Sequence, residues 1–491
     1  MPDDDSALQE PPHPESRHPH RAAYLACAIV ALSLLIITAT IIQTTQSRTP
    51  APPFTPTPPR STPTPSTTAA LPSPAPTPPA AATNTSPEFR AVWVATVANI
   101  DWPSRKGLPP ATLRAEMVTI LDAIASIHAN AVILQVRPAC DAIYPTPNLP
   151  WSEFLTGAQG QPPPDSPPDY DPLREWIDAA HARGLTLHAW INPFRARHVK
   201  ATGPNAPTHI SALHPDWVHA YDGYLWLDPG IPAARAWVLD TTLDMVRRYD
   251  LDGVHIDDYF YPYPKPNSAF PDDPAFAAAQ EAALADHTAA TALEPPTTSP
   301  TPPPPLDRNT WRRANIDDFV HSLYVNLKAA KPTLQIGISP FGIWRPGSPP
   351  QVAGMDAYAT LHADSRRWLR EGWCDYLAPQ LYWKAEAPKQ PFARLLDWWI
   401  DQNDQHRALT PGLNIGRVLP AADQAESWSP ADITKQIDLM RASKGARGVI
   451  LFSAKAIVEN RRGLADALRA AFPVPAVPPS APAPLIHHHP R

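Results

Sequence analysis

Cysteine is scarce in this chain, which has three among its 491 residues: Cys27, Cys140 and Cys374. This number excludes a disulfide framework and any zinc module built from several cysteine ligands. Cys27 lies in an apolar stretch near the N-terminus. Cys140 should follow the end of one strand and Cys374 should precede the start of another, which are opposite ends of a parallel sheet. We therefore expect no bridge between them.

Basic blocks and glycine-rich or nucleophile motifs are also missing. Lysine and arginine number 41 against 47 aspartates and glutamates, a net charge of −6, so nucleic acid is not expected as a partner. The turn after the first expected strand, residues 97–102, contains no glycine, which disfavours a dinucleotide-binding open sheet. There is no Gly-x-Ser-x-Gly turn either, which disfavours a serine-hydrolase triad.

Aromatic residues and proline are abundant instead. The sequence contains sixteen tryptophans and thirteen tyrosines, many of them near expected strand ends. Such rings stack well on flat, partly apolar ligands such as sugars. The 68 prolines gather in tails and loops, and these segments lack the apolar pattern that a packed core needs.

The N-terminal part of the chain indicates a leader, a membrane segment and a spacer. Residues 1–21 are polar, and Arg17 and Arg21 precede the uncharged apolar run 22–42, which is long enough for a bilayer core. A cleaved signal peptide is the alternative, although the run and its leader are long for one. We expect an uncleaved signal anchor with its arginines in the cytoplasm. A disordered linker rich in proline and threonine should follow over residues 43–87.

Residues 88–472 are expected to form one domain, with a proline-rich disordered tail over 473–491. Strand-like and helix-like segments alternate eight times, with strands expected at 90–97, 131–137, 185–192, 253–257, 334–339, 376–382, 408–414 and 448–453. This pattern is typical of an α/β fold, the (β/α)8 TIM-type barrel, here with enlarged loops. A proline-rich patch at 295–305 should be one such surface loop. A doubly wound open sheet is the alternative fold.

Polar residues follow the predicted strands at the end where parallel barrels place their active sites. The stretch Leu251–Pro262 begins as a buried strand and then presents Asp257, Asp258 and a row of aromatic rings. Strand alternation directs a further set of side chains inward: Gln135, Arg137, His188, Trp190, Asn192, His255, Tyr259, Gln380, Tyr382 and Asn414. The sequence therefore predicts a polar cavity at this mouth of the barrel.

Two adjacent carboxylates can serve the cleavage of a glycosidic bond. Such cleavage needs a proton donor and a group that stabilises an oxocarbenium-like centre. Where the substrate carries a 2-acetamido group, that group can be the nucleophile, with Asp257 orienting it and Asp258 acting as general acid. Where the pair supplies a conventional nucleophile, Asp141 or Glu153 is the expected distant acid.

Nine motifs recur along the domain: Arg90–Val97, Asp101–Pro103, Gln135–Pro138, Pro150–Gly157, His188–Pro193, Trp226–Gly230, His255–Pro262, Ile338–Trp344 and Pro379–Trp383. In this order they resemble the glycosyl hydrolase-like 10 family of bacterial envelope proteins, over roughly residues 88–470. The resemblance implies a (β/α)8 glycosidase-like domain that is exported and often attached to a membrane. It also implies a substrate, because some relatives cut peptidoglycan glycan strands from which the peptides have been removed.

We therefore expect a membrane-anchored glycoside hydrolase acting on an N-acetylhexosamine-containing envelope glycan, peptidoglycan first. Its catalytic domain should lie outside the cytoplasm, in the periplasm or at the cell surface. The residues expected to bind the polysaccharide are Trp102, Arg137, Trp190, Asn192, His255, Tyr259, Gln380, Tyr382, Trp383 and Asn414. The alternatives are a non-catalytic, membrane-tethered glycan-binding barrel and a hydrolase of another polysaccharide. No metal or cofactor is expected, although His188, His255 and Asp257 present metal-binding atoms.

Overall fold

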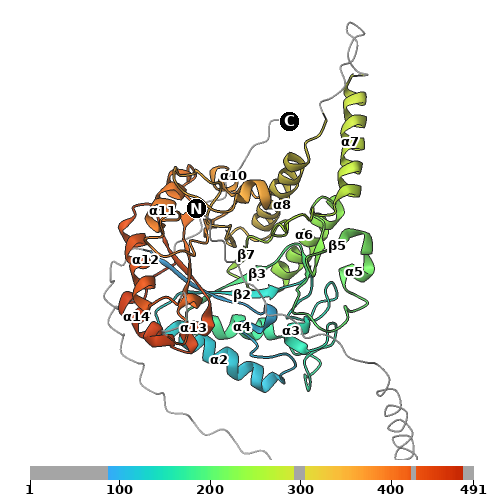
Figure 1. The fold of residues 1–491 in the computed structure, drawn as a ribbon. Helices are drawn as coiled ribbons and strands as arrows, with labels where there is room; N and C mark the ends of the chain where they lie inside the picture. Colours follow the sequence, from blue (N-terminus) through green and yellow to red (C-terminus); the bar gives the residue numbers. More distant parts are fainter. Residues whose placement is uncertain (1–86, 292–304, 422–426, 479–491) are drawn as a thin grey trace, which may run out of the picture. The chain divides into compact units, whose positions relative to one another are not determined.

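The computed structural model describes residues 87–291, 305–421 and 427–478 (Figure 1). The expected leader, the apolar segment 22–42 and the linker up to residue 86 lie outside these ranges, as do most of the patch 295–305 and of the C-terminal tail. Within the described ranges, no helix is long and apolar enough to cross a membrane. The elements below all belong to the compact unit Ala82–Arg491.

Parallel strands form one curled sheet, with the order β10-β9-β8-β7-β3-β2-β1-β12-β11. Their bounds are β1 Phe89–Val94, β2 Ala131–Arg137, β3 Thr186–Ile191, β7 Gly253–Ile256, β8 Gln335–Ile338, β9 Tyr376–Leu377, β10 Ala408–Leu409, β11 Gly412–Asn414 and β12 Gly448–Phe452. Neighbours in this order follow one another along the chain, as in repeated strand–helix–strand units.

The two edges of this sheet are pieces of one segment, residues 408–414. β10 pairs with β9, and β11 pairs with β12. Between the two pairings, the amide of Gly412 donates to the carbonyl of Pro379 at 2.9 Å, and the amide of Ile450 donates to the carbonyl of Pro411 at 3.1 Å. Because the segment is hydrogen-bonded on both sides, the sheet closes on itself as a TIM-like barrel.

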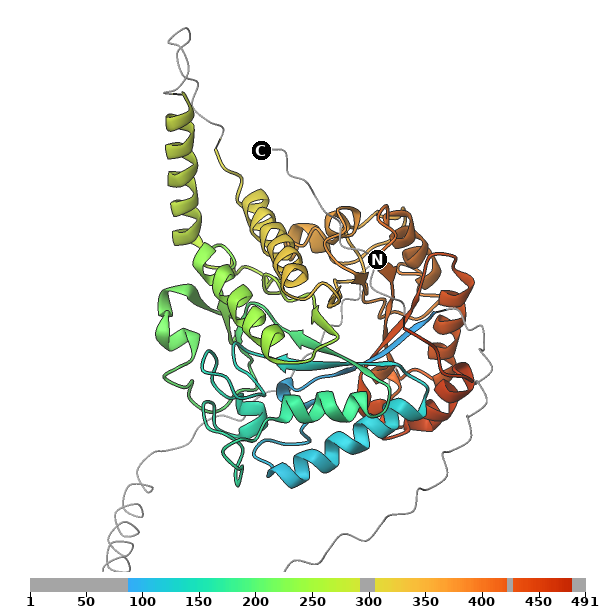
Figure 2. The same cartoon turned by 180° about the vertical axis from the view of Figure 1, so that it is seen from behind.

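Helices cover the outside of the sheet, one after each strand segment (Figure 2). This layer consists of α2 Pro110–Ser126, α4 Pro172–His181, α6 Pro232–Arg248, α8 Arg308–Ala330, α10 Ser365–Arg370, α11 Phe392–Asp401, α12 Pro430–Ala442 and α14 Leu464–Ala471. Side chains of Asp171, Asp307 and Ser429 cap α4, α8 and α12 by accepting backbone N–H groups of their first turns. The predicted alternation of strand and helix is confirmed.

Shorter helices lie in the connections between these units. They are α3 Glu153–Thr156, α5 Ile210–Leu213, α9 Ala357–Thr360 and α13 Ala454–Val458, with 3-10 turns η1 Val97–Asn99, η2 Pro215–Trp217, η3 Ile415–Arg417 and η4 Arg461–Gly463. The connection after β7 contains a longer helix, α7 Asp273–Thr291. The loops are therefore enlarged mainly after β2, β3 and β7.

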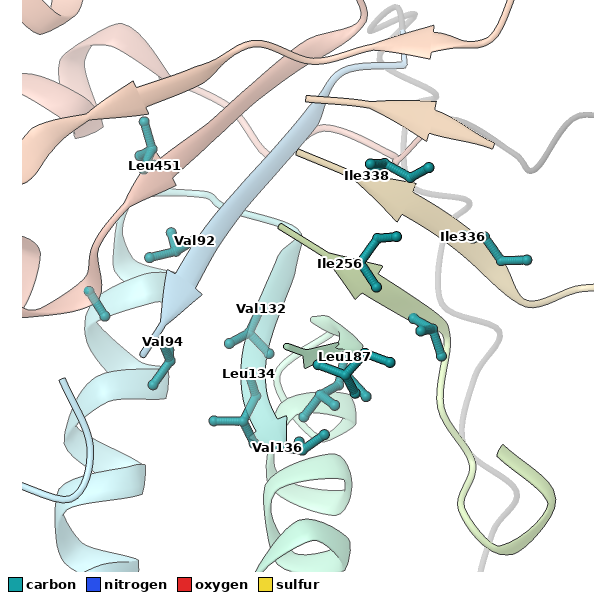
Figure 3. Packing of buried hydrophobic residues seen from close by; sticks show 14 of the residues in the cluster. Val92, Val94, Val132, Leu134, Val136, Leu187, Ile256, Ile336, Ile338 and Leu451 are labelled. Atoms are coloured by element: carbon teal, nitrogen blue, oxygen red, sulfur yellow. The ribbon is translucent and has the colours of Figure 1, made fainter. Parts of the chain in front are cut away.

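Alternation along the strands creates two apolar layers. Outward residues such as Val92, Leu134 and Ile338 belong to the large cluster between the sheet and the helices (Figure 3). Inward residues, among them Trp93 and Trp190, form a smaller cluster inside the barrel. Both of these tryptophans also line the pocket described below, so the inner core is the floor of that pocket.

A second, antiparallel sheet lies in the connection after β3 and was not predicted. It has the order β4-β6-β5, with β4 Arg195–Arg197, β5 Val218–Tyr221 and β6 Tyr224–Leu227. Asp222 and Gly223 join β5 to β6 with φ values of 49° and 78°, as in two-residue hairpin turns. The predicted strand 376–382 is also shorter, because regular pairing ends at Leu377 and Gln380 forms isolated bridges.

Candidate active site

A pocket of about 220 Å³ lies at the carboxyl ends of the barrel strands. Its lining residues come from, or directly follow, seven barrel strands and β4: Trp93, Ala95, Val97, Ile100, Gln135, Trp190, Arg195, His198, Asp257, Asp258, Tyr259, Tyr263, Ser339, Gln380, Tyr382 and Phe452. Carboxylate, guanidinium, amide and hydroxyl groups thus surround a space whose other walls are aromatic. The strand ends converge on one polar pocket, as alternation predicts.

Asp257 is fixed at this pocket by side chains from the end of the neighbouring strand β3 and from the residue that follows it. Its Oδ2 accepts from Trp190 Nε1 at 3.1 Å and from Asn192 Nδ2 at 2.5 Å. Its Oδ1 receives a longer contact, 3.4 Å, from the backbone amide of Tyr259. Because two strong donors occupy Oδ2, a proton on this carboxyl group belongs on Oδ1.

A chain of hydrogen bonds determines how the Asn192 amide points. Gln135 Oε1 accepts backbone amides of Thr96 and Val97, both at 2.9 Å, so Gln135 Nε2 is the donor to Asn192 Oδ1 at 2.5 Å. Arg195 Nη2 donates to the same Asn192 oxygen at 2.6 Å. With its oxygen engaged twice, Asn192 must present its NH₂ group to the carboxylate of the strand-end aspartate described above.

Asp258 is held from the rim of the pocket. Its Oδ2 accepts the hydroxyl of Tyr263, a residue that is 37% exposed. The Gln380 side chain also hydrogen-bonds Asp258, and its Nε2 donates to the Ser339 carbonyl at 2.9 Å. The two aspartates therefore have different supports, a buried one for Asp257 and a half-open one for Asp258.

The pair is difficult to ionise fully. Burial, and then the adjacent Asp258 carboxylate, raises the pKa of Asp257 to about 7, although the Arg195 guanidinium and the Asn192 amide act in the opposite direction. Burial also raises the pKa of Asp258, but the Tyr263 and Gln380 hydrogen bonds lower it. The pair thus retains a proton near neutral pH.

His255 lies below the pocket and is fully buried. Trp93 Nε1 and Ser339 Oγ contact its Nε2 at 3.2 and 2.9 Å, and Tyr376 Oη contacts its Nδ1 at 2.9 Å. The Tyr376 hydroxyl also lies 2.9 Å from His188 Nδ1. Burial lowers the pKa of His255 well below its ordinary value, so the ring is neutral, with Nε2 accepting from Trp93 and Nδ1–H donating to Tyr376.

Comparison with known proteins shows to which family this chain belongs. The model of the glycosyl hydrolase-like 10 family matches residues 88–430. Glycosyl hydrolase YngK of Bacillus subtilis (strain 168) is 37% identical over 391 residues, which cover 78% of this chain and 71% of that protein. Glycosyl hydrolase DigH of Escherichia coli (strain K12) is 31% identical over 395 residues, 75% of this chain and 83% of that protein. The chain belongs to the glycosyl hydrolase-like 10 family. It is a glycoside hydrolase.

A solved structure shares the fold of this glycosyl hydrolase-like 10 member. The glycoside hydrolase domain of PgaB (BpsB) from Bordetella bronchiseptica matches with a TM-score of 0.51 and 16% sequence identity. The match covers 78% of this chain and 99% of that domain. At this identity the likeness concerns the fold, and it agrees with the barrel built from the strand pairings above.

Asp141 and Glu153, the predicted distant acids, do not line the pocket of this glycosyl hydrolase-like 10 chain. Asp141 is buried and accepts the backbone amide of Ala139 at 3.0 Å. Glu153 is buried against Lys106, with which it forms an ion pair, and it accepts the Thr202 amide at 2.8 Å. Those hydrogen bonds lower the pKa of Glu153 despite its burial, so it stays ionised where an acid catalyst must hold a proton.

Two predicted sugar-binding residues lie in the packing layer instead of the pocket. Trp102 is 1% exposed, and its indole N–H donates to the carbonyl of Leu113 at 3.1 Å. Arg137 donates to the carbonyl of Asn192 at 2.8 Å and stacks on the ring of Trp237 in α6. A bulge between residues 135 and 137 of β2 interrupts the alternation, which is why Arg137 does not follow Gln135 into the pocket.

Of the other residues predicted to bind sugar, some line the pocket and some do not. Trp190, Tyr259, Gln380 and Tyr382 line the pocket, whereas Asn192, His255, Trp383 and Asn414 do not. Asn192 and His255 act through neighbours, as described above. Trp383 packs edge-on against Phe341, with ring centroids 5.6 Å apart.

Several pocket residues were missed by sequence reasoning. Trp93 and Ser339 lie on barrel strands or directly after them, so alternation on β1 and β8 identifies them in retrospect. Arg195 and His198 lie on or beside β4, whose three residues carry too little pattern to predict. Arg195 is 3% exposed and its guanidinium lies over the Tyr259 ring, 5.0 Å from its centroid.

Proposed function

We propose that this glycoside hydrolase cleaves an N-acetylhexosamine-containing glycan of the cell envelope, with peptidoglycan glycan strands as the first candidate. The observation that carries the proposal is the acid set: in the described part of the chain, the carboxylates lining the pocket are the adjacent Asp257 and Asp258. Conventional pairs place their carboxyl groups on opposite sides of the scissile bond. Two acids at one strand end suit a substrate that brings its own nucleophile, and a 2-acetamido group is one.

In the proposed mechanism, the acetamido carbonyl oxygen attacks the anomeric carbon as the bond to the leaving oxygen breaks. Asp257, whose pKa is raised by burial and whose Oδ1 receives the long Tyr259 contact, donates its Oδ1 proton to the leaving oxygen. Asp258, whose Oδ2 already accepts the Tyr263 hydroxyl, accepts the acetamido N–H with its carboxylate and holds it in position. These roles are the reverse of those expected from the sequence, because the two supports differ. Water then opens the cyclic intermediate and Asp257 recovers its proton.

Aromatic and amide groups of the pocket suit a sugar ring at this position. Tyr382 and Tyr259 line the pocket beside the aspartates with aromatic rings, and Gln380 lines it with an amide. Burial lowers the pKa of His198 to about 4, so this ring is neutral at physiological pH and can hydrogen-bond to a hydroxyl without adding charge. The resemblance to envelope proteins that cut peptide-free strands supports peptidoglycan as the source of the sugar.

The test is the release of new reducing ends by the purified chain from several polymers. Denuded peptidoglycan strands, peptide-bearing peptidoglycan, chitin-type polymer and cellulose are compared at equal sugar concentration. We expect the fastest release from denuded strands and none from cellulose, which lacks the acetamido group. Equal rates on cellulose would contradict the acetamido mechanism. Binding of denuded strands without release would indicate the non-catalytic glycan-binding barrel instead.

We also propose that the domain works outside the cytoplasm at the end of a membrane anchor. The support comes from the sequence: Arg17 and Arg21 precede the apolar run 22–42, and a proline-rich spacer leads to the domain. We expect the chain to stay with membranes after a high-salt wash and to be degraded by protease added outside the cytoplasmic membrane. Recovery in the soluble fraction at the mass of a cleaved product would favour a signal peptide.

A further inference from the structure

The β5–β6 hairpin lies beside the segment that follows the two aspartates. The Trp226 indole N–H donates to the carbonyl of Phe260 at 2.8 Å. At the other end of the hairpin, the Tyr221 hydroxyl donates to the carbonyl of Ser268 at 3.0 Å. These two bonds, from different strands of the hairpin, hold it against residues 259–268.

A second pocket, of about 270 Å³, lies between the hairpin and this segment. Its aromatic lining residues are Tyr221, Tyr224, Trp226, Tyr259 and Tyr263. Tyr259 and Tyr263 also line the pocket of the aspartates, and their ring centroids are 5.6 Å apart. The two pockets therefore share these two tyrosines and lie next to each other.

The lining of the second pocket suits a neutral sugar. Its rings are fixed against one another, with centroids 6.2 Å apart for Tyr224 and Trp226 and 6.3 Å apart for Trp226 and Tyr259. Trp226 is buried and supports the half-buried Tyr224 and Tyr259, whose rings can stack on the apolar side of a sugar. Among the described residues that line it, the charged side chain is the acidic Asp222, so the pocket does not suit a phosphate or another anion.

We propose that this second pocket is a glycan subsite, which binds the sugar next to the one held by the aspartates. The proposal rests on the proposed function, because it assumes that the first pocket takes a sugar. The hairpin would then make the protein selective for polymers over single sugars. Binding at both positions uses two sets of contacts on one chain, so affinity rises with glycan length.

Tyr224 is the residue that tests the subsite. It lines the second pocket but not the first, and it is half-buried, with its ring edge-on to His198 at 5.3 Å. We expect Tyr224→Ala to weaken the binding of length-fractionated denuded strands roughly tenfold, the size of one lost stacking contact. Tyr224→Phe keeps the ring and should stay within about twofold of the wild type.

Two controls separate a subsite from a structural role. Inhibition or binding by a single N-acetylhexosamine, which fills the pocket of the aspartates, should be the same in Tyr224→Ala and in the wild type. Tyr358→Ala removes a half-buried tyrosine that packs on Trp344 outside both pockets, and it should leave strand binding unchanged. Thermal unfolding of each full-length variant shows that the domain remains folded.

The outcomes are distinct for this proposal and for the proposed function. Unchanged strand binding in Tyr224→Ala, or an equal loss for strands and for the single sugar, would overturn the subsite. The binding measurement does not need hydrolysis. A wild-type protein that binds strands but releases no reducing ends would therefore contradict the proposed hydrolysis, while the strand affinity of Tyr224→Ala would still decide the subsite.

Discussion

Asp257→Asn should change how the stability of the protein depends on pH. The folded-state pKa of Asp257 is about 7, well above that of an aspartate in an unfolded chain. Between the two values the folded state binds more protons than the unfolded state, so the unfolding free energy falls as pH rises. The contribution of this carboxyl group is fully present near pH 4 and is lost once pH passes about 7. Asparagine does not titrate and removes that dependence.

The size of the effect follows from the shift. A displacement from an ordinary aspartate value to about 7 is roughly three pKa units, and each unit corresponds to about 1.4 kcal/mol. The stability difference between wild type and Asp257→Asn should therefore change by about 4 kcal/mol between pH 4 and pH 9, in favour of the variant at high pH. Part of this change is transmitted through Asp258, whose own pKa falls when the neighbouring charge is removed.

The assay is thermal unfolding of both proteins across this pH range at constant ionic strength. Glu153→Gln is a matched control of opposite sign, because hydrogen bonds hold the pKa of Glu153 below its ordinary value. The stability that Glu153 contributes is present above the unfolded-state pKa and is lost as pH falls through the folded-state value, so Glu153→Gln should cost most at high pH. A wild-type minus Asp257→Asn difference that is flat from pH 4 to pH 9 would refute the buried, proton-holding carboxyl group.

Three further predictions concern the surroundings of the pair. Asn192→Ala removes a donor that lowers the pKa of Asp257, so the alkaline limb of the kcat/KM profile should move to higher pH; an unmoved limb would contradict the role of the amide. Tyr263→Phe removes a hydrogen-bond donor to Asp258 and should raise the pKa of Asp258. The acidic limb of the kcat/KM profile should then move to higher pH. Asp141→Asn should retain hydrolysis within about tenfold, well short of a typical acid–base loss, since Asp141 does not line the pocket, and a larger loss in a folded variant would return it to the catalytic set.

The sequence predicted the barrel because each of its eight units carries both a strand-like and a helix-like period. The side chains that line the pocket from β3 and β7, Trp190 and Asp257, follow from alternation along buried strands. The prediction of inward-facing side chains was wrong where a strand departs from strict alternation. The bulge in β2 turns Arg137 outward. Trp383 was expected to bind sugar although alternation with Gln380 and Tyr382 points it the other way, and it packs against Phe341 outside the pocket.

Other features depend on contacts between distant parts of the chain. Trp102 belongs to a family motif, but its ring is buried beside Trp176, with ring centroids 5.3 Å apart. The local sequence pattern does not reveal this contact. The β5–β6 hairpin is signalled by Asp222 and Gly223, yet its place beside the aspartates depends on long-range hydrogen bonds such as that from Trp226. The residues around a position in the sequence therefore showed which strand or helix it belongs to. They showed less well which distant residues it contacts in the folded protein.

The measurement that tests the central claim most directly is hydrolysis of denuded glycan strands by Asp257→Asn and Asp258→Asn beside the wild type. Both variants should release reducing ends at least about a hundredfold more slowly, in line with acid–base catalysis, while strand binding and thermal unfolding show that each remains folded. A wild-type rate in either folded variant would contradict the assignment of catalysis to this pair.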